Sequence, residues 1–320
     1  MARLASPPIL LAPQTHRRDR GLRGVVALLA LLSVAPLLGW VFGLGRFAMW
    51  FRMVALPALL VVGLVAWTVS RPAGRHPDVR TAMVAGAIGG LIGTIGYDLF
   101  RLPFLAMGFR LLAPIDSYGV LLLDAHSSSA LSGFAGWAYH FSNGICFGIA
   151  YAMVALGRNW RWGVLWAMVL ETASVVTPFA DTYGLTGRWG LIAIAYGAHV
   201  PYGLAIGWAA SRGEALCAQL SEIGRRTPAF ALAGLVAVLA LWHQPLGGGR
   251  AAATTSLVGD RFSPAWVRVP VDGCIDIEGG ADVQHRCFSE AGVHRLRVDD
   301  RPYSGGFVIV DREMRREHVG

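Results

Sequence analysis

Charged residues are scarce in this chain, and lysine is absent. They make up 15% of its 320 residues, and all 28 basic residues are arginine, whereas a soluble domain of this size carries about a quarter charged residues. Hydrophobic residues make up 54% of the sequence, in runs that reach the ~20 residues needed to cross a bilayer. This balance excludes an ordinary soluble globule and predicts a multi-pass helical membrane protein.

The sequence also lacks the short motifs of common enzyme classes. It has no nucleophile elbow, phosphate loop, dinucleotide fingerprint or HExxH pair. The net charge of +8 would by itself suggest nucleic acid, but the arginines are spread over short loops and tails, where their use is to set membrane topology. We therefore expect no nucleic-acid partner and no turnover enzyme.

Seven apolar stretches predict transmembrane helices, at residues 24–44, 50–70, 81–100, 130–156, 162–179, 189–210 and 228–243. Arginines gather before the first stretch and in alternate loops, which places the N-terminus in the cytoplasm and the C-terminus outside a bacterial cytoplasmic membrane. No cleavage site follows the first stretch, so we expect it to remain as an anchor. Segment 101–128 is broken by Pro and Gly and predicts an interfacial or re-entrant helix on the outer face.

The chain changes character after the last apolar stretch. The predicted plan is an arginine-rich cytoplasmic tail (1–23), a transmembrane domain (24–243), a flexible linker (244–255) and an extracytoplasmic β domain (256–320). The β domain is expected from short alternating runs such as "AWVRVPV" and "GFVIVD", separated by Gly, Asp and Pro. The fold class is thus an all-α polytopic membrane bundle followed by a small all-β sandwich.

The stretch "FSPAWVRVPVDGCIDIEGGADVQHRCFSEAGVHRLRVDDRPYSGGFVIVD" resembles a plastocyanin-like cupredoxin domain. The resemblance puts His285 at the early copper-ligand position. It puts Val298, Arg301 and Ser304 where the family has its Cys, His and Met ligands. A type 1 copper site needs two imidazoles and a thiolate. The resemblance therefore implies a cupredoxin-like scaffold without copper, suited to docking a periplasmic or membrane protein.

Cys274 and Cys287 lie on neighbouring predicted strands of this exported domain. A disulfide between them is the favoured prediction, because oxidising compartments maintain such bonds. The alternative is an improvised metal site of Cys287, His285 and His294, for which no recognised ligand spacing exists.

Two predicted spans share one pattern of histidine and glycine. "HFSNGICFG" begins at His140 and "HVPYGLAIG" begins at His199, each with Gly four and eight residues later. On a helix this spacing forms a stripe of small residues that lets another backbone approach closely. The span 81–100 has its own glycine face, so we predict tight packing among these three helices, and the match suggests a duplicated two-helix unit.

Other polar residues are expected in the same core of the membrane domain, at different depths. Counted at ~1.5 Å per residue, Asp98 and His140 both lie at about 27 Å, His199 at about 20 Å and Glu171 at about 15 Å. The sequence therefore favours two pairs, Asp98 with His140 and Glu171 with His199, over one four-ligand site or a haem. Arg101, three residues after Asp98, is expected to pair with it on the helix surface.

Ionisable groups inside a membrane usually mark a pathway or a site. We therefore predict an accessory or ion-handling membrane protein in which His140, Glu171 and His199, with Asp98, bind a divalent metal ion or relay protons. The alternatives are a metal-dependent intramembrane enzyme, which needs at least three convergent ligands, and a structural scaffold. The lipid bilayer is the expected environment in each case, and no cofactor is identified.

Overall fold

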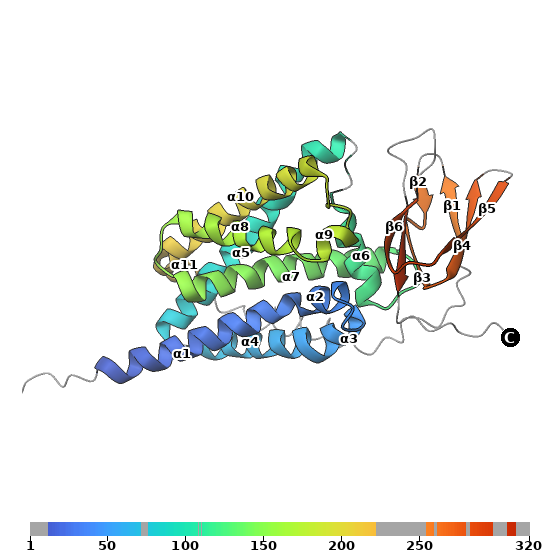
Figure 1. Ribbon diagram of the computed structural model, residues 1–320. Coiled ribbons are helices and arrows are strands. Elements are labelled where there is room, and N and C mark those ends of the chain that lie inside the picture. The colour runs from blue at the N-terminus through green and yellow to red at the C-terminus, as the bar shows by residue number, and fades with distance from the viewer. Residues whose placement is uncertain are drawn as a thin grey trace, which may run out of the picture.

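A computed structural model describes residues 12–71, 76–107, 109, 111–221, 254–258, 261–279, 282–296 and 306–311. A bundle of helices is followed by two small β-sheets at one end of the bundle (Figure 1). The helical segments are α1 (Ala12–Leu31), η1 (Leu32–Val34), α2 (Ala35–Val41), α3 (Phe47–Trp50), η2 (Phe51–Ala55), α4 (Leu56–Val69), α5 (Pro77–Ala106), α6 (Ala113–Leu122), α7 (Ala130–Ala155), α8 (Trp160–Val175), α9 (Phe179–Thr182), α10 (Trp189–Ser211) and α11 (Gly213–Ser221).

Four helical stretches among the described residues are long and apolar enough to cross a membrane, namely Asp19–Val41, Phe47–Val69, Pro77–Ala106 and Trp189–Ser211. They coincide with the first, second, third and sixth predicted spans, so the membrane class is supported at these four. Large apolar side chains such as Leu28, Leu64 and Leu99 are exposed on them, as expected for lipid-facing surfaces.

The fourth and fifth predicted spans form helices that are not long and apolar enough to count as candidate membrane spans. α7 is 26 residues long, but polar and small residues such as His140 and Asn143 lower its hydropathy. α8 has only 16 residues and contains Glu171. α7 packs against α1, α5 and α6, and α8 packs against α10, so both have helical neighbours. The predicted span 228–243 lies outside the described residues.

Glycine lets α5 lie in the middle of the bundle. Gly86 and Gly90 contact the backbone of α7, while Gly89 and Gly93 contact α10 on the other side. The predicted packing among these three helices is therefore confirmed. Close backbone approach is possible only because these positions carry no Cβ atom.

Segment 101–128 is more regular than its sequence suggests. α5 continues through Pro103 to Ala106, and α6 then covers Ala113–Leu122 with most of its residues buried. A Cβ atom on Gly119 would lie 1.6 Å from the carbonyl oxygen of Ser132. α6 is thus packed directly onto α7.

The C-terminal strands form two sheets. The strands are β1 (Thr254–Val258), β2 (Arg261–Ser263), β3 (Trp266–Pro270), β4 (Gly273–Gly279), β5 (Asp282–Phe288), β6 (Gly292–Arg295) and β7 (Phe307–Asp311). One sheet has the order β2-β1-β4-β5 and the other has the order β3-β7-β6. Both sheets contribute to one apolar core that includes Phe262, Val267, Ile275, Phe288 and Val308.

The strands bear on two predictions from the sequence, the extent of the linker and the cupredoxin resemblance. β1 begins at Thr254, inside the stretch predicted as linker. Val298, Arg301 and Ser304, the positions that the cupredoxin resemblance assigns to copper ligands, lie outside the described residues. Two sheets with a shared core agree with a small β domain, and the relationship to cupredoxins remains a prediction.

The β3 strand joins the sheets to the helices. The amide of Arg268 donates to the carbonyl of His126 at 2.7 Å, and the amide of Ser128 donates to the carbonyl of Trp266 at 2.9 Å. The indole of Trp266 is 1% exposed. It belongs to a cluster, here called the joint cluster, that unites helix and sheet residues: Phe47, Tyr118, Val120, Leu121, Leu122, Leu123, Ala135, Tyr139, Trp266 and Ile309.

Ion pairs surround this joint. Asp124 pairs with Arg268 of β3 and, at 3.0 Å, with Arg46, while Arg268 also pairs with Asp311. Burial alone would raise the pKa of Asp124, but the guanidinium groups of Arg268 and Arg46 outweigh it and hold this pKa below its ordinary value of 3.8. The sheets therefore dock on the helical bundle through apolar and charged contacts.

Candidate functional site

Two helices carry the same stripe of histidine and glycine, and each packs it against a different neighbour. The stripes are His140, Gly144 and Gly148 on α7, and His199, Gly203 and Gly207 on α10. The α7 stripe faces α5 and the α10 stripe faces α8. We call these contacts the first pair (α5–α7) and the second pair (α8–α10).

A single glycine of the partner helix fits between the two stripe glycines in the first pair. A Cβ atom on Gly90 would lie 2.5 Å from the carbonyl oxygen of Gly144, and a Cβ atom on Gly148 would lie 2.7 Å from the Cα of Gly90. Separations below 3.0 Å to backbone require the helices to move apart. The contact therefore depends on glycine at positions 90 and 148, and a Cβ atom on Gly144 would lie 1.8 Å from the Thr94 hydroxyl oxygen.

The second pair repeats this arrangement. A Cβ atom on Gly163 would lie 2.3 Å from the carbonyl oxygen of Gly203 and 2.6 Å from the amide nitrogen of Gly207. Gly163 of α8 thus occupies the place that Gly90 of α5 has in the first pair.

Each partner helix also carries a carboxylate eight residues after this glycine. Asp98 follows Gly90 and Glu171 follows Gly163 at that spacing, and each carboxylate faces the histidine of its pair. His140 Nε2 lies 3.2 Å from both carboxylate oxygens of Asp98. His199 Nδ1 lies 3.3 Å from Glu171 Oε2. The structure therefore brings the predicted site residues together as two histidine–carboxylate pairs.

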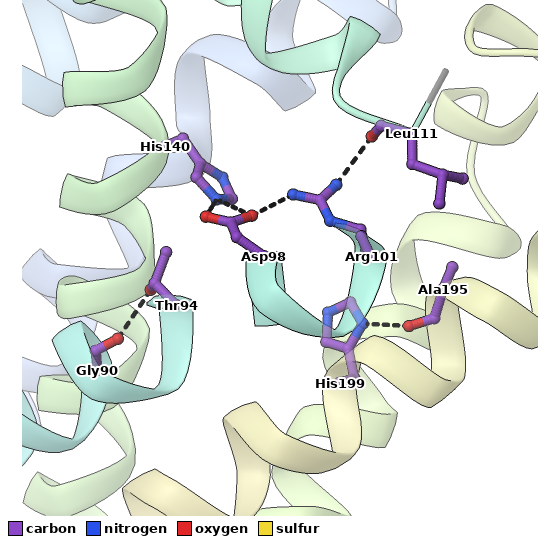
Figure 2. Close-up of polar contacts among 8 residues, drawn as sticks. All are labelled: Gly90, Thr94, Asp98, Arg101, Leu111, His140, Ala195 and His199. Atoms are coloured by element: carbon purple, nitrogen blue, oxygen red, sulfur yellow. Dashed lines mark hydrogen bonds and ion pairs between the residues drawn. The ribbon is translucent and has the colours of Figure 1, made fainter. Parts of the chain in front are cut away.

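Arg101 distinguishes the first pair from the second. Its guanidinium donates to the Asp98 carboxylate and, at 2.8 Å, to the carbonyl oxygen of Leu111 (Figure 2). Asp98 thus has two cationic or hydrogen-bonding partners, one on each side. The residue three positions after Glu171 is Ser174, whose hydroxyl donates to the carbonyl of Leu170 at 3.3 Å, so the second pair has no equivalent of Arg101.

The negative charge of Glu171 is consequently less well neutralised by neighbouring groups than that of Asp98. Its side chain is buried, with 5% exposure, and its Oε1 has no hydrogen-bond partner in the part of the chain that the structure describes. The His199 ring lies beside its other oxygen and makes the only ion pair of Glu171 within the described part of the chain. A carboxylate so placed requires a proton or a cation, because burying an unpaired charge is costly.

The hydrogen bonds of His199 define which ring nitrogen carries a proton. Nδ1 lies 2.9 Å from the carbonyl oxygen of Ala195 (Figure 2). A carbonyl oxygen only accepts hydrogen bonds, so Nδ1 carries a hydrogen and donates. The neutral ring then keeps its lone pair on Nε2, which is the atom that can take up a further proton.

Tyr97 connects the two pairs, and the sequence reasoning did not single it out. Its ring centroid lies 6.1 Å from that of His140 and 4.8 Å from that of His199. The Arg101 guanidinium lies over the same ring at 4.2 Å. The available signal was its place in "GTIGYDLFR" next to Asp98, which puts it on the helix that both histidine helices contact.

The predicted metal set does not form a single centre. Within the described ranges, three or more His, Cys, Asp or Glu ligand atoms gather within 4.8 Å of one another only at Cys274, His285 and Cys287. Asp98, His140, Glu171 and His199 remain two pairs. A tetrahedral site in the membrane would need at least three of them to converge, so this arrangement favours proton chemistry.

No protein-family model, curated protein or solved structure matches this chain.

Proposed function

We propose that this chain is an integral membrane ion-handling protein whose polar core relays protons. The observation that supports it is Glu171, a buried carboxyl group whose Oε1 has no hydrogen-bond partner among the described residues. Carboxyl groups of this kind in membrane helices are a feature of proton pathways. The histidine beside it supplies a second group able to gain and lose a proton.

The relay step uses both nitrogens of His199. A proton arriving at Nε2 makes the ring an imidazolium, because Nδ1 already carries a hydrogen. The Nδ1 hydrogen then leaves the carbonyl oxygen of Ala195 and passes to Glu171 Oε2, 3.3 Å away, which leaves a neutral ring and a neutral carboxylic acid. Tyr97 and His140 extend the polar path toward the first pair, where Arg101 holds Asp98.

The topology that we propose follows from the arginines. The N-terminus lies in the cytoplasm of a bacterial cell, and the C-terminal sheets lie outside the cytoplasmic membrane. The disulfide between Cys274 and Cys287 supports this placement, since oxidising compartments preserve such bonds. The exposed β4–β5 hairpin is the surface that we assign to a periplasmic or membrane protein partner.

The test is proton flux into liposomes that contain the purified protein and a pH-sensitive dye, driven by a potassium diffusion potential. Glu171→Gln keeps the shape of the side chain but cannot exchange a proton, so flux should fall at least ~10-fold. His199→Ala should have a similar effect. Glu214→Gln, an exposed position on α11, is the matched control and should retain wild-type flux.

Two outcomes would overturn the proposal. Equal flux in wild type and Glu171→Gln would leave Glu171 a structural residue, and the chain a scaffold. Stoichiometric metal in purified wild type that is lost in His140→Ala/His199→Ala would replace proton relay by metal handling. Circular dichroism of each variant establishes that a loss of flux is not a loss of fold.

A further inference from the structure

The β4–β5 hairpin brings four metal-ligating side chains onto one face. Cys274 is directly opposite Cys287, and Asp276 is directly opposite His285. Side chains of a strand alternate between faces, so residues 274 and 276 share a face with their partners 285 and 287. This face is open to solvent, since Cys287 and His285 are exposed and Cys274 is half-buried.

The donor atoms are already close together. The ligand atoms of Cys274, His285 and Cys287 lie within 4.8 Å of one another. A tetrahedral zinc with bonds of ~2.3 Å to sulfur and ~2.0 Å to nitrogen needs its ligand atoms about 3.3–3.8 Å apart. After reduction, the two sulfurs can separate and the exposed His285 ring can approach them by side-chain rotation.

Asp276 prepares His285 for such a role. Its carboxylate lies 2.7 Å from His285 Nδ1. A neutral imidazole that donates from Nδ1 to a carboxylate presents the lone pair of Nε2 to a metal ion, and this pairing is common behind metal-bound histidines. The two thiolates and the imidazole are soft and borderline donors that suit zinc, and Asp276 orients the imidazole from behind.

The structure holds the two cysteines as a disulfide, and a disulfide has no thiolate to offer. We propose that reduction of this disulfide converts the hairpin into a binding site for a thiophilic divalent metal ion, with Zn²⁺ as the reference ion. The site is independent of the proton relay in the membrane helices.

The reductant in this proposal is a dithiol. One of its thiolates attacks a cysteine sulfur and its second thiol resolves the mixed disulfide. The dithiol is thereby oxidised to a disulfide, and Cys274 and Cys287 together gain two electrons and two protons. Metal binding then releases the two thiol protons, so the cycle is balanced. Solvent exposure of the sulfurs gives the attacking thiolate access.

The same geometry removes His294 from the site. The sequence alternative grouped Cys287 and His285 with His294, but His294 lies on β6 of the other sheet. Its Nε2 is 2.7 Å from the carbonyl oxygen of Glu290, and its ring packs against Phe288. Cys274 takes the place that His294 had in that alternative.

The experiment measures Zn²⁺ binding by full-length protein in detergent, in competition with a chromogenic chelator. One sample is oxidised and the other is reduced with a dithiol and desalted without oxygen. All proteins carry Cys146→Ser/Cys217→Ser, which removes the free thiols of the helices. Reduced protein should bind one Zn²⁺ ion per chain at least ~100-fold more tightly than oxidised protein, and Co²⁺ should give a thiolate charge-transfer band.

Variants assign the ligands. His285→Ala leaves the disulfide intact and should lower the affinity of the reduced protein at least ~10-fold, and Asp276→Asn should lower it about 10–100-fold. His294→Ala is the matched control and should bind as the parent does. Equal binding by oxidised and reduced protein, no Zn²⁺ binding after reduction, or unchanged binding in His285→Ala would each overturn the site.

Discussion

The first pair and the second pair place a histidine opposite a carboxylate with the same glycine contact, yet they balance the carboxylate differently. Gly90 and Gly163 each fit between two glycines of the facing helix. Asp98 forms ion pairs with His140 and Arg101, whereas the only ion pair of Glu171 among the described residues is with His199. The two pairs therefore share their helix packing. They differ in how many charged partners neutralise the carboxylate.

This difference assigns separate tasks to the two carboxylates. A partly buried aspartate held by an arginine and a histidine is a fixed ion pair that supports structure. A buried glutamate beside one histidine can change its protonation without breaking such a pair. Repetition of the glycine contact and of the carboxylate spacing in both pairs supports the predicted duplication of a two-helix unit.

The two pairs also differ in their contact with the C-terminal sheets. Tyr139, the residue before His140, belongs to the joint cluster with Trp266, and its hydroxyl donates to the carbonyl oxygen of Ser33 at 3.1 Å. The second pair contributes no residue to that cluster. The first pair is therefore anchored to the sheets through α7, and changes in the sheets should reach it first.

The largest expected effect comes from neutralising the two carboxylates in turn. Asp98→Asn leaves the guanidinium of Arg101, which is 5% exposed, without its counter-ion, and should cost about 3–5 kcal/mol of unfolding free energy. Glu171→Gln removes no ion pair with an arginine and should cost about 1 kcal/mol or less. Thermal unfolding in detergent, followed by circular dichroism, compares the two.

A double variant sharpens this result. Asp98→Asn/Arg101→Met removes both charges and should recover much of the lost stability, because replacing a buried pair by apolar groups is often neutral. Equal destabilisation by Asp98→Asn and Glu171→Gln would remove the distinction between a structural and an exchanging carboxylate.

Trp266→Ala tests the unequal anchoring of the two pairs. Loss of a fully buried indole from the joint cluster should cost about 3 kcal/mol, and hydrogen exchange should speed up in the first turns of α7 while α8 keeps its protection. Val283→Ala, at a position that is 64% exposed on β5, is the control. Similar changes in α7 and α8 would contradict a specific link between the sheets and the first pair.

Substituting the central glycine of each pair tests whether the two contacts are equivalent. Gly90→Ala and Gly163→Ala both place a methyl group against backbone, and each should cost about 1–3 kcal/mol through separation of the helices. Gly63→Ala has nothing within 4 Å of its added Cβ and should be neutral or slightly stabilising, since alanine favours helix. A large loss in only one of the two variants would argue against a repeated unit.

Sequence patterns located the features that depend on nearby residues. Hydropathy found the four long apolar helices, and the spacing of His140, Gly144 and Gly148 identified a helix face that packs closely. Depth along the helices paired Asp98 with His140 and Glu171 with His199, because residues on straight helices rise by a constant amount.

Features that depend on distant contacts were not accessible in this way. Nothing in the local pattern around Trp266 distinguishes burial in the β core from burial against α6 and α7. The extended pairing of β3 with the His126–Ser128 segment joins residues more than a hundred positions apart. Tyr97 gains its role only because α7 and α10 both contact α5. Such contacts are set by packing of the whole chain, which one sequence does not encode locally.

The smallest expected effect is a pH dependence at the joint, confined to the side of the molecule that anchors the first pair. The pKa of Asp124 is lowered in the folded chain, so its ion pairs contribute stability above pH 3.8, and this contribution is lost as the pH falls through the folded pKa below that value. Arg268 keeps Asp311 as a second partner, which limits the loss.

Hydrogen exchange of β3 and the start of α7 should therefore be steady from pH 7 to about pH 5. The exchange rate should rise beyond the intrinsic trend only below about pH 4. Asp124→Asn should remove that rise and leave α8 and α10 unchanged. A rise that persists in Asp124→Asn would assign the acid sensitivity to another group, and a rise shared equally by α8 would show that the two pairs are anchored alike.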